Sequence, residues 1–230
     1  MLFFRQYMYK GKILAGNHDT FRIESLDDRW RMHNVRHEEG SYVVDVRKDL
    51  FRDEVPLLNS GWKISSSKLY FSLLAALYQN KDHPDPGQKD LVESCRQMQD
   101  RIFYNNWVRT STKVVISDNQ GLIFPDDSGY IDDVIEPGLA RMGGWLEDNS
   151  ADADVFEKIF DEKDLSKLSD VFSYISGGRR TFLLGGKNGC MGNGFEQRGV
   201  VSFCTFYGGR FNIYLARPVQ DWPVQGVKIL

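Results

Sequence analysis

A glycine-rich segment, residues 185–199 (GGKNGCMGNGFEQRG), combines groups that anion binding requires. Its glycines allow backbone N–H groups to turn toward an anion. Positive charge comes from the predicted ligand-binding residues Arg179, Arg180, Lys187 and Arg198, and this set points to a hydrolase or transferase acting on an anionic or phosphate-bearing small molecule. The segment is not a P-loop, because no Lys-Ser or Lys-Thr closes it. A flexible connection between two strands is the simpler interpretation, and we favour it.

Cys190 is the catalytic candidate, because it lies in this segment beside Lys187. A nearby cation lowers the pKa of a thiol and makes it more nucleophilic. No histidine lies close to Cys190 in the sequence, so the general base that usually activates such a nucleophile is not evident. The three cysteines show no CxxC spacing, which favours a reduced cytosol over a disulfide scaffold.

His33 and His37 are the metal-binding candidates. On a helix, this spacing of four places both imidazoles on one face, where they could share a metal ion. On a strand, they would lie on one side but about 13 Å apart, too far to share one ion. The strand-like pattern of 41–47 and the turn residues 38–40 favour a hairpin, and a helix over 26–37 is the alternative. No complete metal or cofactor motif is present.

The tetrapeptide Gly16-Asn17-His18-Asp19 resembles a signature of calcineurin-like metallophosphoesterases. In that family an Asn and a His of this signature help to hold a two-metal centre, and further ligands come from upstream Asp-x-His and Gly-Asp motifs. The fifteen residues before the tetrapeptide contain neither Asp nor His. We therefore expect a turn at this position.

Two other patterns contain residue types that could bind a ligand. The acidic stretch within 125–154 could bind a hard cation, but Ile131 occupies the position of the EF-hand glycine, so a solvated acidic loop is favoured. Trp107, Arg109, Ser111 and Lys113 alternate along one face of a predicted strand, and such a face could stack on a base or another ring. A solvent-facing strand with one packed tryptophan is the simpler interpretation.

The elements that position these residues indicate an α+β fold. Apolar periodicity predicts a helical pair over about 65–104 and a second helical segment over about 153–176, with Gly177 as a helix C-cap. Both are expected to pack on antiparallel β-sheet elements at the two ends of the chain. The favoured organisation is one domain over 1–230. The alternative divides the chain into 1–124 and 155–230, with the acidic irregular stretch 125–154 as the connection.

A hairpin is predicted over 200–217, because Gly208-Gly209 suits a type I′ turn between two β-rich segments. A two-residue loop would pair Phe206 with Phe211 and Cys204 with Ile213, making Cys204 a small core residue. Pro218 and Pro223 argue against a long continuation as a central strand.

Bulk composition narrows the class of function. The formal charge of −3 gives no global field to attract nucleic acid, so nucleic-acid binding is disfavoured. No apolar run is long enough to span a bilayer, and charged residues interrupt the apolar start, so a soluble cytoplasmic protein is expected. The favoured function is a non-catalytic binding or assembly protein, with a protein partner or a homo-oligomer, that uses an aromatic and arginine surface.

Overall fold

The computed structural model describes residues 20–52, 54–104, 106–116, 121–124, 134–135, 143–148, 153–184, 197–206, 209–216 and 222–230. The predicted turn at 16–19 and most of the stretch 125–154 lie outside the described residues. The α+β prediction is confirmed: helices pack on a mostly antiparallel sheet. The division into one or two domains stays a prediction.

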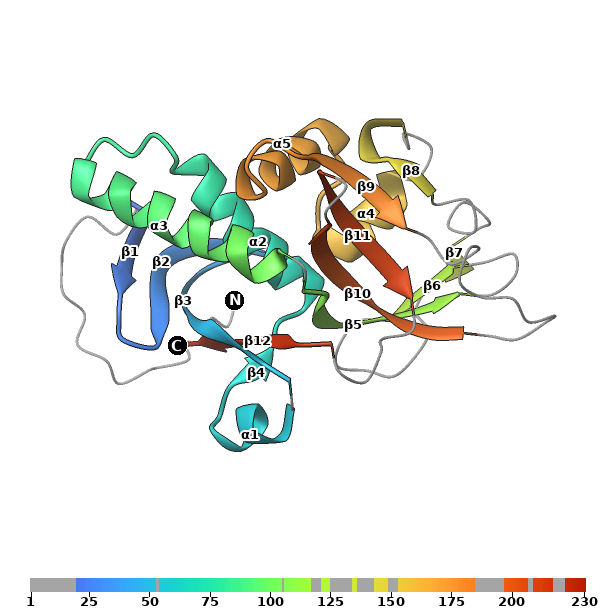
Figure 1. The fold of residues 1–230 in the computed structure, drawn as a ribbon, viewed down its shortest axis with the longest axis horizontal. Coiled ribbons are helices and arrows are strands. Elements are labelled where there is room, and N and C mark those ends of the chain that lie inside the picture. Colours follow the sequence, from blue (N-terminus) through green and yellow to red (C-terminus); the bar gives the residue numbers. More distant parts are fainter. Residues whose placement is uncertain are drawn as a thin grey trace, which may run out of the picture.

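Within the described residues, twelve strands form one sheet, shown in Figure 1. Its main order is β1-β2-β3-β12-β5-β10-β11-β9-β8, with β4 beside β12, β6 beside β5, and β7 beside β6. The pairs β9–β11 and β5–β12 are parallel, and the other pairs are antiparallel. The strands are β1 Arg22–Ser25, β2 Arg29–His37, β3 Gly40–Phe51, β4 Lys63–Ile64, β5 Val108–Ile116, β6 Gly121–Phe124, β7 Val134–Ile135, β8 Gly143–Trp145, β9 Arg180–Leu184, β10 Gln197–Phe206, β11 Arg210–Ala216 and β12 Val224–Ile229.

The predicted helices are present, and short-range capping explains their ends. The α-helices of the described residues are α1 Glu54–Asn59, α2 Ser67–Gln79, α3 Pro86–Phe103, α4 Ala153–Phe160 and α5 Leu165–Ile175, and a 3-10 turn spans Leu146–Asp148. The Asp85 carboxylate accepts the Gln88 N–H at the start of α3. Pro86 has no N–H, but the helix loses no hydrogen bond there because the first N–H groups of a helix have no partner within it. At the end of α5, Gly177 has φ +70°, and the Gly178 N–H donates to Ser173 O, which completes a Schellman motif.

The core lies between the helices and one face of the sheet. Figure 1 shows α2 and α3 across the β1–β3 end, and α4 and α5 beside β9, β10 and β11. The buried ring of Phe203 on β10 is the meeting point, because one aromatic ring from each of these four helices lies 5.6–6.1 Å from it. These rings belong to Tyr70, Phe103, Phe160 and Phe172. We call this helix-covered side the inner face and the opposite side the outer face.

The C-terminal hairpin is confirmed, but its predicted register is wrong by one residue. Phe206 pairs with Arg210, and Cys204 pairs with Asn212 instead of Ile213. The pairing leaves three residues between the paired ends, and Gly209 at φ +70° suits the left-handed position of a three-residue loop. Cys204 is buried as predicted, but the shift turns it away from Phe211 and toward the outer face.

The C-terminal strand corrects a second expectation. β12 starts directly after Pro223 and lies between β3 and β5, in the middle of the sheet. Pro223 does not interrupt the pairing, because only its carbonyl is used: it accepts the Arg109 N–H at 3.0 Å. The missing N–H of the proline therefore costs the sheet no hydrogen bond at this point.

Gly226 on β12 lets α1 pack closely against part of the outer face. A Cβ on Gly226 would lie 2.5 Å from Leu57 Cδ1, 3.0 Å from Arg47 Cγ and 3.4 Å from Trp62 Cβ. Leu57 is fully buried, so it has little room to move. Leu57 of α1 and Trp62 thus cover the β3–β12 region of the outer face.

We expect Gly226→Ala to lower the free energy of unfolding by about 1–3 kcal/mol, the usual range for overpacking. Urea denaturation measures this loss. In the double variant with Leu57→Ala, the two losses should sum to less than their separate values, because the second change opens the space that the first one fills. Strict additivity would contradict the contact.

Candidate binding surface

Two of the predicted ligand-binding arginines, Arg179 and Arg180, contact different carboxylates. Arg179 points toward α3, where its guanidinium lies 2.9 Å from Asp100 Oδ1 and also donates to Ser176 O. Arg180, the next residue, pairs with Glu147 at 2.9 Å. Arg198 lies in β10 opposite Val115. Lys187 and Cys190 lie outside the described residues, so the proposed ligand and catalytic roles in 185–199 stay predictions.

The hairpin prediction for the histidines is confirmed, but they do not share a side of the strand. Asn34 has φ +58°, and the β2–β3 register shifts between Met32 and Val35. This bulge inverts the alternation, so that Met32 and Val35 are both buried on the inner face. His33 therefore lies on the outer face beside Glu24, whereas His37 contacts α2 on the inner side.

His37 and Ser72 form a contact that resembles a nucleophile–base pair. His37 Nδ1 lies 3.0 Å from Ser72 Oγ. Ser72 Oγ also donates to Lys68 O within its own helix, a common arrangement for a helical serine. Glu38 Oε1 is 3.9 Å from His37 Nε2, too far to orient the imidazole by a hydrogen bond. Burial lowers the pKa of His37. Among the described residues, no carboxylate forms a hydrogen bond with His37 Nε2, as the orienting group of a triad would.

The buried thiols do not suit nucleophilic chemistry. Burial raises the pKa of Cys204 to about 12 and raises the pKa of Cys95 further still. Both are free and buried. Among the described residues, no group of three or more His, Cys, Asp or Glu side chains gathers where it could hold a metal ion.

The alternation of side chains along each strand shows which residues of β8, β9 and β11 lie on the outer face. Leu183 and Ile213 are paired and buried in the core, so they point to the inner face. Their neighbours along each strand point the other way. Across the outer face, Trp145 pairs with Phe182, and Arg180 pairs with Arg210.

Arg180, Trp145, Phe182 and Arg210 form a continuous line of contacting groups, which we call the arginine–aromatic row. The Arg180 guanidinium lies 4.2 Å from the Trp145 ring centre, and that ring meets Phe182 edge to face at 5.2 Å. The Arg210 guanidinium lies 4.4 Å from the Phe182 ring centre. Both distances are within the range of favourable cation–π contacts. The row thus presents two cations whose positions are fixed by rings.

Glu147 supplies the negative charge next to the row. It lies in the 3-10 turn after β8, which is anchored by the fully buried Leu146. Ser169 on α5 donates to the second carboxylate oxygen at 3.0 Å. The hydrogen bond from Arg180, with that from Ser169, holds the pKa of Glu147 below its usual value. In the part of the chain that the structure describes, Arg210 makes no ion pair, so the row carries an excess of positive charge.

A second aromatic group continues the outer face toward β5. Trp107 stacks on Trp222 at 5.2 Å and packs against Tyr214 at 5.0 Å. Tyr214 on β11 is separated from the β5 side by β10, whose outward residues there, Ser202 and Cys204, are small and fully buried. Their size allows the two rings to meet across that strand. Trp107 is therefore part of a three-ring group, not the single packed tryptophan of the simpler sequence interpretation.

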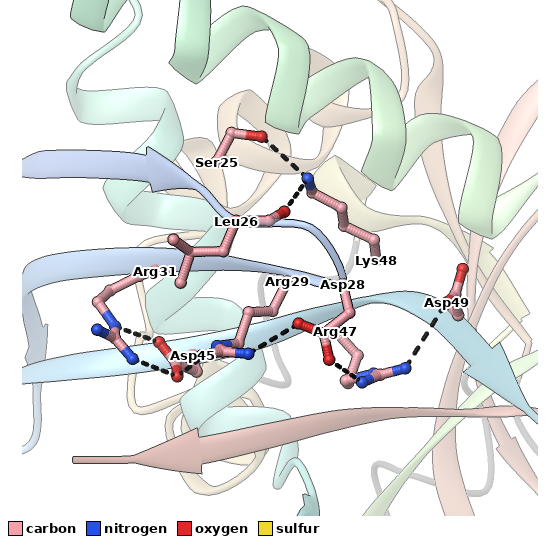
Figure 2. Close-up of polar contacts among 9 residues, drawn as sticks. All are labelled: Ser25, Leu26, Asp28, Arg29, Arg31, Asp45, Arg47, Lys48 and Asp49. Atoms are coloured by element: carbon pink, nitrogen blue, oxygen red, sulfur yellow. Dashed lines mark hydrogen bonds and ion pairs between the residues drawn. The ribbon is translucent and has the colours of Figure 1, made fainter.

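The other end of the outer face carries an ion network, shown in Figure 2. Asp45 on β3 accepts two hydrogen bonds from Arg31, at 2.7 and 2.9 Å, and lies 2.9 Å from Arg29 Nε. Asp28 accepts from Arg29 at 2.8 Å and from Arg47. Each of these three guanidiniums already has a carboxylate partner. The network therefore fits a structural role, joining β2, β3 and the loop before β2.

Sequence reasoning found Arg180 but missed Trp145, Phe182 and Arg210. A signal for Phe182 is present: Phe182 and Arg180 alternate with Thr181 and Leu183, as strand residues on opposite faces do. Trp145 lies in the stretch that the sequence predicts to be irregular. Only the tertiary pairing of β8 with β9 brings its ring to the row.

Comparisons of the chain with protein-family models, with curated proteins and with solved structures gave no match. Among the described residues, no helix is both long and apolar enough to cross a membrane.

Proposed function

We propose that this protein is a non-catalytic binding or assembly protein of the cytoplasm, whose outer face on β8, β9 and β11 contacts a protein partner or a second copy of the chain. The arginine–aromatic row carries this proposal. Arginine, tryptophan and tyrosine dominate the energetics of protein interfaces. Stacking on a ring also restricts a guanidinium before binding, which reduces the entropy that association must remove.

Other observations favour this proposal over its competitors. The net charge of −3 disfavours a nucleic-acid partner, and the two described cysteines are free thiols, as expected in a reduced cytosol. The competing hydrolase or transferase function uses Lys187 and Arg198 to hold the ligand, with Arg179 and Arg180 as further ligand-binding residues, and these two contact different carboxylates, Asp100 and Glu147. That function now depends on residues 185–199.

Site-specific photo-crosslinking tests the proposal. A benzophenone amino acid replaces Phe182 on the outer face in one variant and Tyr78 on α2 in a matched control. Both positions carry a partly buried aromatic ring, so the probe is accommodated similarly. We expect irradiation of cells to yield a discrete crosslinked protein, or a crosslinked dimer of the chain, from position 182 and not from position 78.

Sedimentation velocity over a wide range of concentrations then decides between a dimer and a foreign partner, and mass spectrometry identifies the latter. Equal yields from both positions, or a monomer without crosslinks from position 182, would contradict the proposal.

A further inference from the structure

The arginine–aromatic row also indicates what kind of partner it suits. Arg180 and Arg210 occupy paired positions on the parallel strands β9 and β11, so their Cα atoms lie about 5 Å apart. The side chains diverge from there: the Arg180 guanidinium lies on Trp145 and the Arg210 guanidinium lies on Phe182, so the two rings stand between the two charges. The fold therefore fixes two cations at the two ends of one line on the outer face.

Glu147 pairs with only one of these two cations. Its carboxylate contacts Arg180 at 2.9 Å and is held on its other side by Ser169, which leaves Arg210 without a carboxylate among the described residues. The Arg180 side chain is 57% exposed, so the ion pair with Glu147 is accessible to water and to a competing anion. An exposed pair of this kind is weak.

From this juxtaposition we infer that the Arg180–Arg210 pair is an acceptor for an acidic segment of a partner protein, which places a carboxylate against Arg210 and competes with Glu147 for Arg180. The inference rests on the proposed binding function and specifies its partner. Charge complementarity carries it, because the row has two cations and the carboxylate beside it, Glu147, pairs with Arg180 alone. Flanking rings offer apolar contact to the remainder of such a segment.

Fluorescence anisotropy with defined peptides tests this inference. The probes are a fluorescein-labelled peptide of alternating glutamate and serine, a peptide of the same length with glutamine in place of glutamate, and an oligothymidylate of similar length. We expect the wild-type chain to bind the acidic peptide most tightly. Arg210→Gln should weaken that binding about tenfold, the loss expected for one charge-assisted hydrogen bond.

Matched variants separate the site from general charge effects. Arg101→Gln removes an exposed arginine from α3 and should leave the affinity unchanged. Glu147→Gln should tighten binding about threefold, because Arg180 then has no internal competitor. Arg210→Lys keeps the charge but not the flat guanidinium and should give an intermediate affinity. Thermal unfolding of each variant verifies that it folds.

Three results would overturn the inference. The first is equal affinity for the glutamate and glutamine peptides, in which case the crosslinking result for the outer face can still stand. The second is an equal loss of affinity in Arg101→Gln and Arg210→Gln. The third is tighter binding of the oligothymidylate with the same dependence on Arg210, which would assign the row to nucleic acid.

Discussion

Replacing Phe203 with alanine is expected to lower the free energy of unfolding by about 3–5 kcal/mol, the range measured for buried phenylalanines. The ring is fully buried and lies within 5.6–6.1 Å of one ring from each of α2, α3, α4 and α5. Truncation therefore opens a cavity that four elements would have to close together. Single domains have a total stability of about 5–15 kcal/mol, so much of the stability of the fold depends on this one contact.

Urea denaturation followed by tryptophan fluorescence and by circular dichroism measures the effect. The midpoint should fall with little change in the slope, because the surface exposed on unfolding is nearly the same. Leu58→Ala is the matched control: this apolar side chain is 50% exposed, and its loss should change stability by less than about 0.5 kcal/mol. Similar losses in both variants would show that Phe203 does not join the helices to the sheet.

The parts of the fold that could be predicted from the sequence are those with local causes. The helix ending at Ile175 has an apolar stripe, an N-cap at Asp164 and a glycine after its end, and all three signals lie within the helix and its flanks. The β2–β3 hairpin has a short turn between two strand-like segments. These interactions connect residues close in sequence, so their pattern is visible without the tertiary structure.

The sequence predictions are wrong where pairing between distant segments determines the register or the presence of a strand. Tyr207, Gly208 and Gly209 allow a two- or a three-residue loop, and the choice between them sets the register of β10 and β11. The burial of Val201 and Phe203 on the inner face selects the three-residue loop. Similarly, Pro223 is a strand breaker in isolation, but pairing with β3 and β5 stabilises β12 directly after it.

The candidate surface was only partly predictable for the same reason. An arginine and aromatic surface could be anticipated from composition, and Arg180 from its charge near a glycine-rich segment. The row itself requires β8 beside β9 and β9 parallel to β11, which joins residues from 145 to 210. A parallel pair needs a crossover connection, and no turn signal in the sequence specifies it.

Asp45→Asn is expected to lower the free energy of unfolding by about 3 kcal/mol, at the lower end of the range for breaking a buried ion pair. Asp45 is only 4% exposed and holds Arg31 through two hydrogen bonds and Arg29 through a third close contact. The amide keeps the shape but has no charge, and its NH₂ group faces a donor. Two partly buried guanidiniums then lose their shared anion.

The control and a double variant distinguish the buried pair from surface charge. Asp49→Asn removes a carboxylate that is 71% exposed and 3.6 Å from Arg47, so stability should change by less than about 0.5 kcal/mol. Combining Asp45→Asn with Arg31→Met should recover part of the loss, because the second change removes the cation left without a partner. If Asp45→Asn costs no more than Asp49→Asn in urea denaturation, the network in Figure 2 does not stabilise the β2–β3 end of the sheet. A loss that is larger in the double variant would instead show that the Arg31 side chain stabilises the fold by packing and not by its charge.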